Sequence, residues 1–438
     1  MRRVKSFFGG IYPDDSKKST AEAPIEILAA PPTLVVPLLQ HAGAEATPVV
    51  AKGDEVLKGQ LLGQANGAVS APVHSPVSGT VVAIEPRAHA CGSSVTSIVI
   101  ENNGEDKWVE KNSHHDPVQL DAATIRQRIA DAGIVGMGGG GFPTALKLNP
   151  PNNIVIDYLI INGCECEPYL TADHRLMVEY SEEIILGAKL MAKASGARKI
   201  IIAVEDNKPD ALEALRRHAG AIEVISLPTK YPEGGEKQLI QAVTGREVPS
   251  GGLPFQAGAI VQNVATAWAV TKAVRDGEPS ISRVVTVTGK TIKEPKNFLV
   301  PLGTPIEYLV EAAGGFNGTV GKVVVGGPMM GGAQFDLSAP VCKTVSGVLA
   351  FIEEESITPP VLPCIKCARC VDVCPANLLP LRLEAYGMNK MWDEAQRYGA
   401  LDCIECGCCS YICPSKRPLL QYIRLAKREI VAKQKKPS

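Results

Sequence analysis

The sequence predicts a multidomain chain of mixed α/β and α+β class, and three observations carry this prediction. The length of 438 residues suggests about three domains at roughly 150 residues each. The hydrophobic periodicity changes from short strands near the N-terminus to alternating strands and helices in the middle. Nine of the 13 cysteines lie between Cys364 and Cys413, which marks a separate C-terminal domain.

The composition indicates a soluble or peripheral globular protein. Hydrophobic residues make up 45% and charged residues 21% of the chain, which excludes wholesale disorder and fibrous repeats. The net charge of −1 gives no electrostatic reason to expect nucleic acid as a partner. No apolar run reaches the length of about 18 residues that spans a membrane. The basic start Met1–Ser6 lacks the apolar core of a signal peptide.

Residues 1–115 are expected to form an N-terminal β module. Short alternating runs between residues 49 and 82 are interrupted by Gly and Pro, as in a small barrel or sandwich. The segment resembles the barrel-sandwich fold of lipoyl and biotinyl carrier domains. Such carriers present a modified Lys at a hairpin tip, and Leu62–Ser75 contains no Lys. We therefore expect a docking or structural module rather than a carrier.

Residues 116–283 are expected to form an α/β domain. Ile125 and Ile129 fall on one face of a helix predicted over 121–132, which Gly133 ends. Further along, runs with strand and helix periods alternate at the spacing of an α/β layer. Strands are expected at 154–161, 199–204 and 222–227, and helices at 181–194 and 209–219.

Two smaller domains complete the expected architecture. Residues 284–345 show short strands with one helix at 306–313, and residues 355–438 form an α-rich segment that ends in a basic helix. The last segment, 416–438, holds eight Lys and Arg residues. Contact with anionic lipid or an acidic partner is one interpretation of this charge, and a solvated helix is the other.

Two cysteine runs dominate the C-terminal domain. Each has the spacing C-x2-C-x2-C-x3-C-P, which is the signature of ferredoxins with two clusters. In that arrangement three thiolates of one run and the last thiolate of the other bind each [4Fe-4S] cluster. The signature predicts one cluster on Cys364, Cys367, Cys370 and Cys413, and a second on Cys403, Cys406, Cys409 and Cys374.

Alternatives to this ligand set remain open. Structural zinc on four thiolates is one, although duplicated runs with terminal Cys-Pro pairs favour iron–sulfur clusters. Spacing alone does not establish that the runs exchange their fourth ligand. Cys408 has no place in the pattern, and we expect a bystander rather than an alternate ligand. The residues between the runs, 375–402, are expected to form an inserted helical connection.

A glycine-rich loop over 133–144 contains a G-x-G-x-x-G pattern that starts at Gly136. A Rossmann fingerprint needs a strand before the loop, and here a helix is predicted instead. Glycines without Cβ atoms nevertheless leave backbone N–H groups accessible to a phosphate. A phosphate-binding loop is therefore predicted, with a flexible linker as the alternative.

The strand predicted before residue 162 ends in Asn162-Gly163-Cys164-Glu165-Cys166-Glu167. Carboxylates at a strand end can accept hydrogen bonds from ribose or ribityl hydroxyls, whereas the alternative is a solvated acidic turn. No second cysteine pair lies near Cys164 and Cys166 in the sequence, so we expect free thiols.

Together these motifs resemble the C subunits of Rnf/Rsx membrane electron-transport complexes. The resemblance covers nearly the whole length, as a barrel-sandwich module, an FMN/NADH-binding α/β domain, a β-grasp domain of the soluble-ligand-binding type and a double [4Fe-4S] ferredoxin domain. The middle of the chain is similar to the flavoprotein subunit of respiratory complex I. That flavoprotein carries a single cluster, whereas this chain has two complete motifs.

The resemblance to the complex I flavoprotein implies a set of cofactor-binding residues. It places Gly136, Gly138 and Gly139 on FMN or the dinucleotide, and Lys147 beside NADH. The other matched positions are Asn162, Glu165, Glu167, Tyr231, Gly234, Glu236, Asn263 and Thr266. Several neighbours depart from the family pattern: Met137 replaces Arg, Cys164 and Cys166 replace Asp and Ser, and Gly235 replaces Glu.

The resemblance also implies a function. It implies an enzyme subunit that exchanges a hydride between NAD(H) and FMN and relays single electrons through two [4Fe-4S] clusters. The implied partners are the membrane and iron–sulfur subunits of a ferredoxin:NAD+ oxidoreductase coupled to ion transport, with ferredoxin as an indirect partner. The implied location is peripheral, on the cytoplasmic face of the membrane. The alternative is a ferredoxin-like wiring subunit without flavin or NAD(H).

Overall fold

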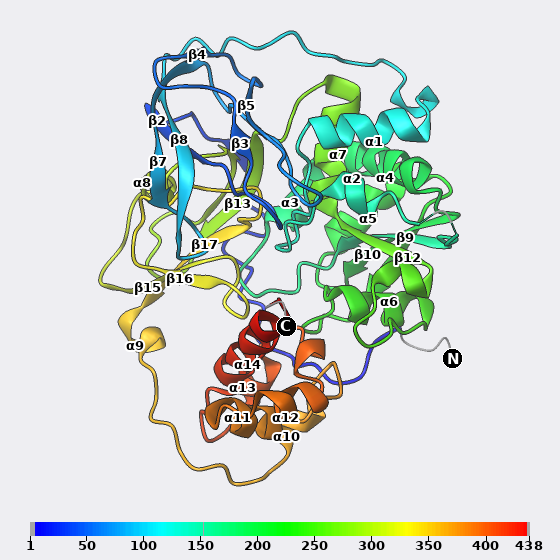
Figure 1. Ribbon diagram of the computed structural model, residues 1–438, viewed down its shortest axis with the longest axis vertical. Coiled ribbons are helices and arrows are strands. Elements are labelled where there is room, and N and C mark those ends of the chain that lie inside the picture. Colours follow the sequence, from blue (N-terminus) through cyan, green and yellow to red (C-terminus); the bar gives the residue numbers. More distant parts are fainter. Residues whose placement is uncertain (1–4, 152, 436–438) are drawn as a thin grey trace.

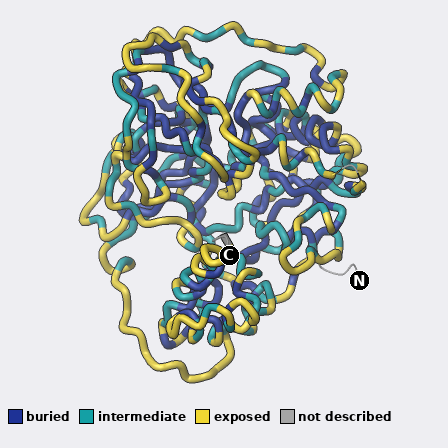
Figure 2. The backbone as a smooth tube through the Cα atoms, in the orientation of Figure 1, coloured by how far each residue is buried: buried dark blue, intermediate teal, exposed yellow. Residues whose placement is uncertain are grey.

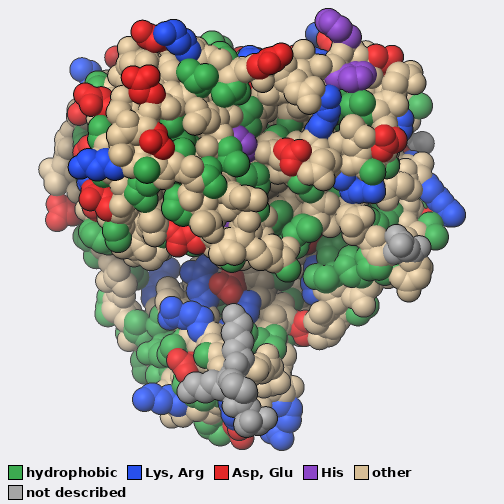
Figure 3. Space-filling model, turned by 45° about the horizontal axis from the view of Figure 1, so that its top comes forward, with side chains coloured by type: hydrophobic (Ala, Val, Ile, Leu, Met, Phe, Trp, Pro, Cys, Tyr) green, Lys and Arg blue, Asp and Glu red, His purple; other side chains and the backbone are tan. Residues whose placement is uncertain are grey.

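The computed structural model describes residues 5–151 and 153–435, which form a larger lobe and a smaller C-terminal lobe (Figure 1). The larger lobe contains three sheet-based domains, and the smaller one is helical. In the space-filling view of Figure 3 a hollow separates the lobes, with Lys and Arg side chains at its margin. The start of the chain passes between the lobes, as the dark blue segment in Figure 1.

The N-terminal β module consists of two small antiparallel sheets. One has the order β2-β8-β7-β4 and the other β3-β5-β6. Alternate residues point into the space between them, so that Leu34, Val36, Leu62 and Ile98 are fully buried. The strands are β2 (Thr33–Pro37), β3 (Thr47–Pro48), β4 (Glu55–Val56), β5 (Leu61–Gln64), β6 (Val73–His74), β7 (Gly79–Ala88) and β8 (Ser94–Asn102).

The module is expected to start at residue 1, and the first residues that the structure describes lie outside its two sheets. Strand β1 (Ile25–Ile27) pairs in parallel with β14 (Lys296–Pro301) of another domain. Residues 5–23, which we call the strap, run along the α/β domain and the C-terminal lobe instead. The first strand in the two sheets of the β module is β2.

The α/β domain is built on a parallel sheet of order β11-β10-β9-β12. Helix α6 covers one face of the sheet, and the helices α4 and α7 cover the other. The domain contains η1 (Pro117–Gln119), α1 (Ala122–Asp131), α2 (Thr144–Lys147), β9 (Tyr158–Gly163), α3 (Ala172–Glu179), α4 (Ser181–Ser195), β10 (Lys199–Glu205), α5 (Pro209–Ala219), β11 (Glu223–Leu227), α6 (Glu236–Thr244), η2 (Pro254–Ala257), β12 (Ala259–Asn263) and α7 (Val264–Asp276).

The strand order creates a switch point between β9 and β12. From β9 the chain continues outward to β10 and β11, and then returns to place β12 on the other side of β9. In open parallel sheets, ligands bind outside the carboxyl ends of the strands at such a point. The strand expected at 154–161 begins later, at Tyr158, because residues 157 and 158 both donate their N–H groups to Gly258 O.

The β-grasp domain has a six-stranded sheet of order β1-β14-β13-β17-β15-β16. It extends beyond the expected range of 284–345, because β17 pairs with both β13 and β15 in the middle of the sheet. Its remaining elements are β13 (Ser282–Thr288), α8 (Ile306–Ala312), β15 (Val320–Val325), β16 (Gly332–Gln334) and β17 (Gly347–Ile352).

The C-terminal lobe packs short helices against one long basic helix, α14. Ile423, Ala426 and Ile430 recur every three or four residues and bury one face of α14. On its other side Arg424 and Lys427 pair with Glu405. The elements are α10 (Arg369–Asp372), α11 (Pro380–Met388), α12 (Trp392–Arg397), η3 (Ala400–Asp402), α13 (Cys408–Ile412) and α14 (Leu419–Lys435), whereas α9 (Glu353–Ser356) packs against β15 and β17 of the β-grasp domain.

Candidate functional site

The glycine-rich loop lies at the switch point, against the start of α7. Met137 N donates to Thr266 Oγ1 at 2.9 Å, and Gly136 N donates to Phe142 O at 2.9 Å, which closes the loop. Asn263 caps α7 by accepting from Ala265 N at 2.8 Å. Of the predicted residues, Thr266 therefore holds the loop and Asn263 caps α7, so that the loop lies at the positive end of a helix dipole.

The outer side of this loop is open. Gly138, Gly139 and Gly140 are exposed, and a Cβ atom added to Gly139 or Gly140 would meet no atom within 4 Å. At Gly138 the nearest atom would be Asn263 Cβ, at 3.4 Å. Backbone N–H groups without Cβ atoms, beside a helix N-terminus, fit the phosphate of a flavin or a dinucleotide.

A buried arginine supports the loop from the β-grasp domain. Arg283 Nη2 donates to Met137 O at 2.6 Å, and its Nη1 donates to Lys343 O. Burial lowers the pKa of Arg283 to about 10, so the side chain stays charged at neutral pH. Neither its role nor its position follows from the sequence, because Arg283 lies about 146 residues from the loop that it supports.

The polar groups at the ends of β9 and β12 make hydrogen bonds to neighbouring segments. Asn263 Nδ2 donates to Asp173 Oδ2 at 2.6 Å, and Asn162 Nδ2 donates to Gly234 O at 2.9 Å. Burial, together with the nearby Glu165, raises the pKa of Asp173 to about 7. The sequence did not indicate Asp173, because only the folding of the chain brings this residue to the edge of the sheet.

Glu165 and Glu167 were predicted to contact ribose or ribityl hydroxyls, and the structure gives both carboxylates backbone partners. Glu165 accepts from Asp173 N at 2.7 Å and His174 N at 3.1 Å, at the start of α3. Glu167 accepts from the N–H groups of residues 329 and 330, each at 2.9 Å. Burial raises the pKa of Glu167 to about 7.

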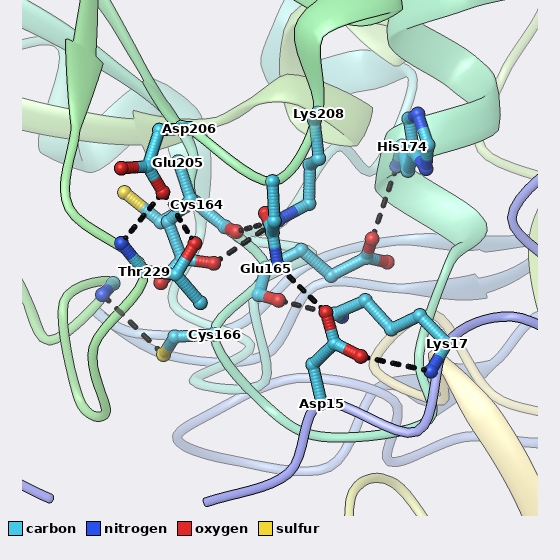
Figure 4. Close-up of polar contacts among 12 residues, drawn as sticks. Asp15, Lys17, Cys164, Glu165, Cys166, His174, Glu205, Asp206, Lys208 and Thr229 are labelled. Carbon is cyan, nitrogen blue, oxygen red and sulfur yellow. Dashed lines mark hydrogen bonds and ion pairs between the residues drawn. The ribbon is translucent and has the colours of Figure 1, made fainter. Parts of the chain in front are cut away.

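Two buried lysines hold the loop that carries these carboxylates, as Figure 4 shows. Lys17 Nζ, from the strap, donates to the carbonyls of Glu165 at 2.9 Å and Glu167 at 3.0 Å. Lys208 Nζ donates to Cys164 O at 2.7 Å and pairs with a buried Glu205 oxygen at 3.0 Å. Burial raises the pKa of the Cys164 thiol, so that it stays protonated.

Of the remaining predicted residues, some lie near the glycine-rich loop and one contacts the C-terminal lobe. Lys147 forms an ion pair with Glu236 at the start of α6. Tyr231 is buried, and its hydroxyl donates to Cys406 O at 2.8 Å. The structure therefore places Tyr231 against the C-terminal lobe rather than beside Lys147.

The eight predicted cysteine ligands surround two separate cavities in the C-terminal lobe. The first cavity, here site 1, is lined by Cys364, Cys367, Cys370 and Cys413. The second, here site 2, is lined by Cys374, Cys403, Cys406 and Cys409, with Cys408 beside them. The structure thus brings together the two groups that the sequence predicts, including the exchanged fourth cysteines.

The two runs fold in the same way. The second and fourth residues after the first cysteine of each run have positive φ: Lys366 (54°) and Ala368 (61°), then Glu405 (60°) and Gly407 (80°). These turns direct backbone N–H groups toward sulfur, and the amides of Lys366 and Glu405 each lie 3.4 Å from the Sγ atom of the preceding cysteine. Such donors stabilise thiolates.

The arrangement suits a cluster better than a single ion. Four thiolates around one zinc ion would stand about 3.8 Å apart, given a Zn–S bond of about 2.3 Å. Within the described ranges, no three His, Cys, Asp or Glu side chains converge closely enough to hold a single metal ion. The sulfurs instead surround a cavity, as multi-iron clusters require.

The two sites differ in their surroundings. Three of the four site 2 ligands are buried, and one of them, Cys406, packs with Tyr231 and Ile11 of the larger lobe. The strap closes this junction, where Gly10 N donates to Val373 O at 2.9 Å and Ile11 N donates to Tyr231 O at 2.8 Å. At site 1, by contrast, Cys364 and Cys367 are exposed.

Four family models match successive parts of the chain. They are the RnfC barrel sandwich hybrid domain at 5–105, the Nuo51 FMN-binding domain at 129–272, the SLBB domain at 284–332 and the 4Fe-4S dicluster domain at 363–416. These matches confirm the expected fold class. They also confirm FMN as the cofactor of the middle domain and 4Fe-4S clusters as the cofactors of the C-terminal domain.

The fold is also similar to a chain in the crystal structure of an NAD+-reducing [NiFe]-hydrogenase in the H2-reduced state. The TM-score is 0.51 at 22% identity, over 74% of this chain and 64% of that chain. At this identity the likeness concerns the fold alone.

Curated relatives match almost the whole chain. The C subunits of the Na+-translocating ferredoxin:NAD+ oxidoreductase complex of Acetobacterium woodii and the proton-translocating complex of Clostridium ljungdahlii are each 47% identical. The matches cover 98% and 97% of this chain, and 98% and 94% of the relatives. The corresponding protein of the ion-translocating oxidoreductase complex of Rhodobacter capsulatus is 44% identical over 98% of this chain and 84% of its own length. The chain therefore belongs to the family of C subunits of ion-translocating ferredoxin:NAD+ oxidoreductase (Rnf) complexes.

Proposed function

We propose that this chain is the subunit of an Rnf complex at which NAD(H) exchanges electrons with the iron–sulfur chain. FMN, when bound, supplies hydride exchange with NAD(H) and one-electron exchange with the clusters. The chain's own residues bind and orient these groups: the loop residues Gly136, Gly138 and Gly139 at the flavin, and eight cysteines at the clusters.

The order of the sites is the observation that carries this proposal. The glycine loop lies at the switch point of the α/β domain, and the same domain reaches site 2 through Tyr231. Site 1 lies beyond site 2 and opens to the surface. Electrons that enter or leave at the loop can thus reach a partner through two successive clusters. The larger lobe has no comparable exposed cysteine group in the described ranges.

The polar groups near the loop have supporting roles in this scheme. Thr266 fixes the loop, Asn263 caps the helix beside it, and Asn162 positions Gly234. The ion pair of Lys147 and Glu236 is partly exposed, at a position where a dinucleotide can compete for the lysine.

The proposal includes a peripheral position on the cytoplasmic face of the membrane, with the membrane and iron–sulfur subunits as partners and ferredoxin as an indirect one. The C subunits of A. woodii and C. ljungdahlii are named as parts of ion-translocating complexes. In the part of the chain that the structure describes, no helix has the length and apolar character of a bilayer span. An ion path would then belong to other subunits.

A pair of glycine variants tests the flavin assignment. Gly138→Val projects a branched side chain over the loop, where the nearest protein atom to its Cβ is 3.4 Å away, so the fold itself tolerates the change. We expect loss of bound FMN and of NADH:ferricyanide activity, with iron and sulfide unchanged. Gly332→Val, whose Cβ would lie 3.8 Å from its nearest neighbour, should keep both the bound FMN and the NADH:ferricyanide activity. Full flavin in Gly138→Val would refute the loop assignment and favour a wiring subunit without flavin.

A further inference from the structure

The turn between β7 and β8 takes part in a cluster of two thiols and one imidazole, far in sequence from the glycine loop and from sites 1 and 2. The imidazole of His89 lies between the thiols: its Nδ1 is 2.8 Å from Cys91 Sγ, and its Nε2 is 3.3 Å from Cys342 Sγ. His89 and Cys91 belong to the β module, whereas Cys342 lies between β16 and β17 of the β-grasp domain. The cluster therefore spans the junction of these two domains.

The two thiols differ in their access to solvent. All 13 cysteines lie within the described ranges, and only Cys91, Cys364 and Cys367 are exposed. Cys91 is thus the one exposed cysteine outside sites 1 and 2. It lies in an exposed run, 91–94, like many connections of the larger lobe in Figure 2. Cys342 is buried, and burial raises the pKa of its thiol, so that it stays protonated.

The backbone determines which nitrogen of His89 is basic. Cys91 N donates a hydrogen bond to His89 Nδ1 at 3.1 Å. A ring nitrogen that accepts from an amide carries no proton of its own, so in the neutral ring the proton is on Nε2, beside Cys342 Sγ. Burial lowers the pKa of His89, and a hydrogen bond to the Leu39 carbonyl offsets this only in part. The ring is therefore neutral at neutral pH, and its free lone pair faces the Cys91 thiol.

This arrangement is the one that activates cysteine nucleophiles. It requires a thiol within hydrogen-bond reach of a base, and a further group that orients the base. At Cys91 the base is His89, which Cys342 and the Leu39 carbonyl orient. Ser93 Oγ lies 3.0 Å from Cys91 Sγ and can donate a hydrogen bond to the thiolate once the proton has moved.

We propose that Cys91 is a site of covalent modification by low-molecular-weight disulfides, with His89 as its general base. His89 Nδ1 accepts the thiol proton while Cys91 Sγ attacks one sulfur of the disulfide RSSR. The S–S bond of RSSR breaks, a bond from Cys91 Sγ to that sulfur forms, and the leaving thiolate takes the proton from His89 as RSH. One disulfide is consumed and one is formed, so electrons and protons balance. Excess RSH reverses the step.

The modified residue would lie at a contact between domains. Gln334 Nε2, from β16, donates to Ala90 O of the same turn at 2.7 Å. A group added to Cys91 removes the thiol hydrogen bond to His89 and occupies the surface beside this contact. None of the eight predicted cluster ligands takes part, so the modification is independent of the proposed function.

The rate of adduct formation tests the proposal. The cofactor-loaded chain is incubated anaerobically at neutral pH with 2-hydroxyethyl disulfide, and peptide mapping by mass spectrometry follows the adduct at Cys91. We expect Cys91 in the folded chain to react about tenfold or more faster than the same cysteine in the urea-unfolded chain. Folding without activation would leave the rate unchanged or lower it, because it only restricts access.

Three variants identify the source of the acceleration. His89→Gln should reduce the rate to that of the unfolded chain, and Ser93→Ala, at an exposed position, should lose part of the acceleration. His115→Gln changes an exposed histidine outside the cluster and should react as the wild type does. Melting temperatures are measured for all three variants. If His89→Gln does not fold, Ser93→Ala decides: a slower reaction supports activation, and a wild-type rate refutes it.

Two further outcomes would overturn the proposal. One is a Cys91 rate in the folded wild type that does not exceed the rate in the unfolded chain. The other is an equal rate in folded His89→Gln and the wild type. In either case the hydrogen bonds of His89 would serve only to join the β module to the β-grasp domain.

Discussion

At the scale of single residues, the structure buries titratable groups at the junctions of the sites. Glu233 is fully buried, and neither of its carboxylate oxygens has a hydrogen-bond partner among the described residues. Burial, with a contribution from Glu205, raises the pKa of Glu233 to about 8. An unfolded glutamate titrates near 4.3, so the folded state keeps a proton that the unfolded chain loses. Glu233 therefore lowers stability progressively as the pH rises from about 4.5 to about 8.

Glu233→Gln should remove this pH dependence. The amide cannot ionise, so the melting temperature should fall less between about pH 6 and about pH 9 than it does in the wild type. Differential scanning calorimetry of both proteins measures the effect. Glu213→Gln, on the exposed surface of α5, should leave the dependence of the melting temperature on pH unchanged. An identical slope in Glu233→Gln and the wild type would contradict the assignment.

The fourth cysteine of each run gives a second test at this scale. Cys413 lines site 1 and Cys374 lines site 2. Cys413→Ser should perturb the EPR signal that Cys364→Ser also perturbs, because both variants remove a ligand of one cluster. Cys374→Ser should behave like Cys403→Ser. If Cys413→Ser instead matched Cys403→Ser, each run would bind its own cluster.

At the scale of elements, the strap is the part that the sequence did not predict. It connects the α/β domain with the C-terminal lobe. Lys230 Nζ donates to Phe7 O at 2.8 Å and Lys17 holds the loop after β9, both in the α/β domain, and Gly10 N donates to Val373 O of the C-terminal lobe. Gly9 has a φ of 78°, and a Cβ there would lie 2.9 Å from the backbone of Cys374. Only glycine fits this approach between the strap and a site 2 ligand.

Gly9→Ala should displace the strap from site 2. We expect a lower melting temperature and slower reduction of the clusters by NADH, because the junction between α/β domain and cluster lobe loosens. Flavin and iron contents should remain at wild-type values. The matched change Gly67→Ala has a similar φ of 84° but no atom within 4 Å of the new Cβ. Cluster reduction as fast in Gly9→Ala as in Gly67→Ala would show that the strap does not position site 2.

Local signals explain which elements could be predicted. Helix α5 has the predicted bounds of 209–219, because Pro209 starts it and Gly220 ends it. In each cysteine run, the spacing between the cysteines predicts the turns of the backbone. In contrast, β1 has three residues and pairs with β14, about 270 residues away. Tyr231 matched a nucleotide-binding motif, yet it lies against Cys406, because no local pattern encodes contacts between domains.

At the scale of the whole molecule, buried basic side chains connect the domains. Lys343, from the β-grasp domain, is fully buried and donates to Pro72 O at 2.9 Å in the β module and to Gly133 O at 2.8 Å at the glycine loop. Arg283 and Lys17 make similar bonds to backbone carbonyls of neighbouring segments. Each side chain thus satisfies carbonyl groups that would otherwise be buried without donors.

Lys343→Met should weaken both the assembly of domains and flavin binding. Two carbonyls lose their donor, at a cost of about 1–3 kcal/mol for each one left unpartnered. We expect a lower melting temperature and a higher Kd for FMN in reconstitution of the flavin-free protein. Lys293→Met, at an exposed position of the same domain, serves as the control. Equal FMN affinity in the two variants would mean that Lys343 does not support the loop.

The central claim is that one flavin at the glycine loop and two clusters at sites 1 and 2 form a single electron path. The most direct measurement is an anaerobic inventory of iron, sulfide, zinc and flavin per chain, followed by EPR during reduction with NADH. The account predicts one FMN and iron for two four-iron clusters, with both clusters reduced by NADH only while flavin is bound. Zinc in place of iron, or clusters that NADH reduces in the flavin-free chain, would contradict it.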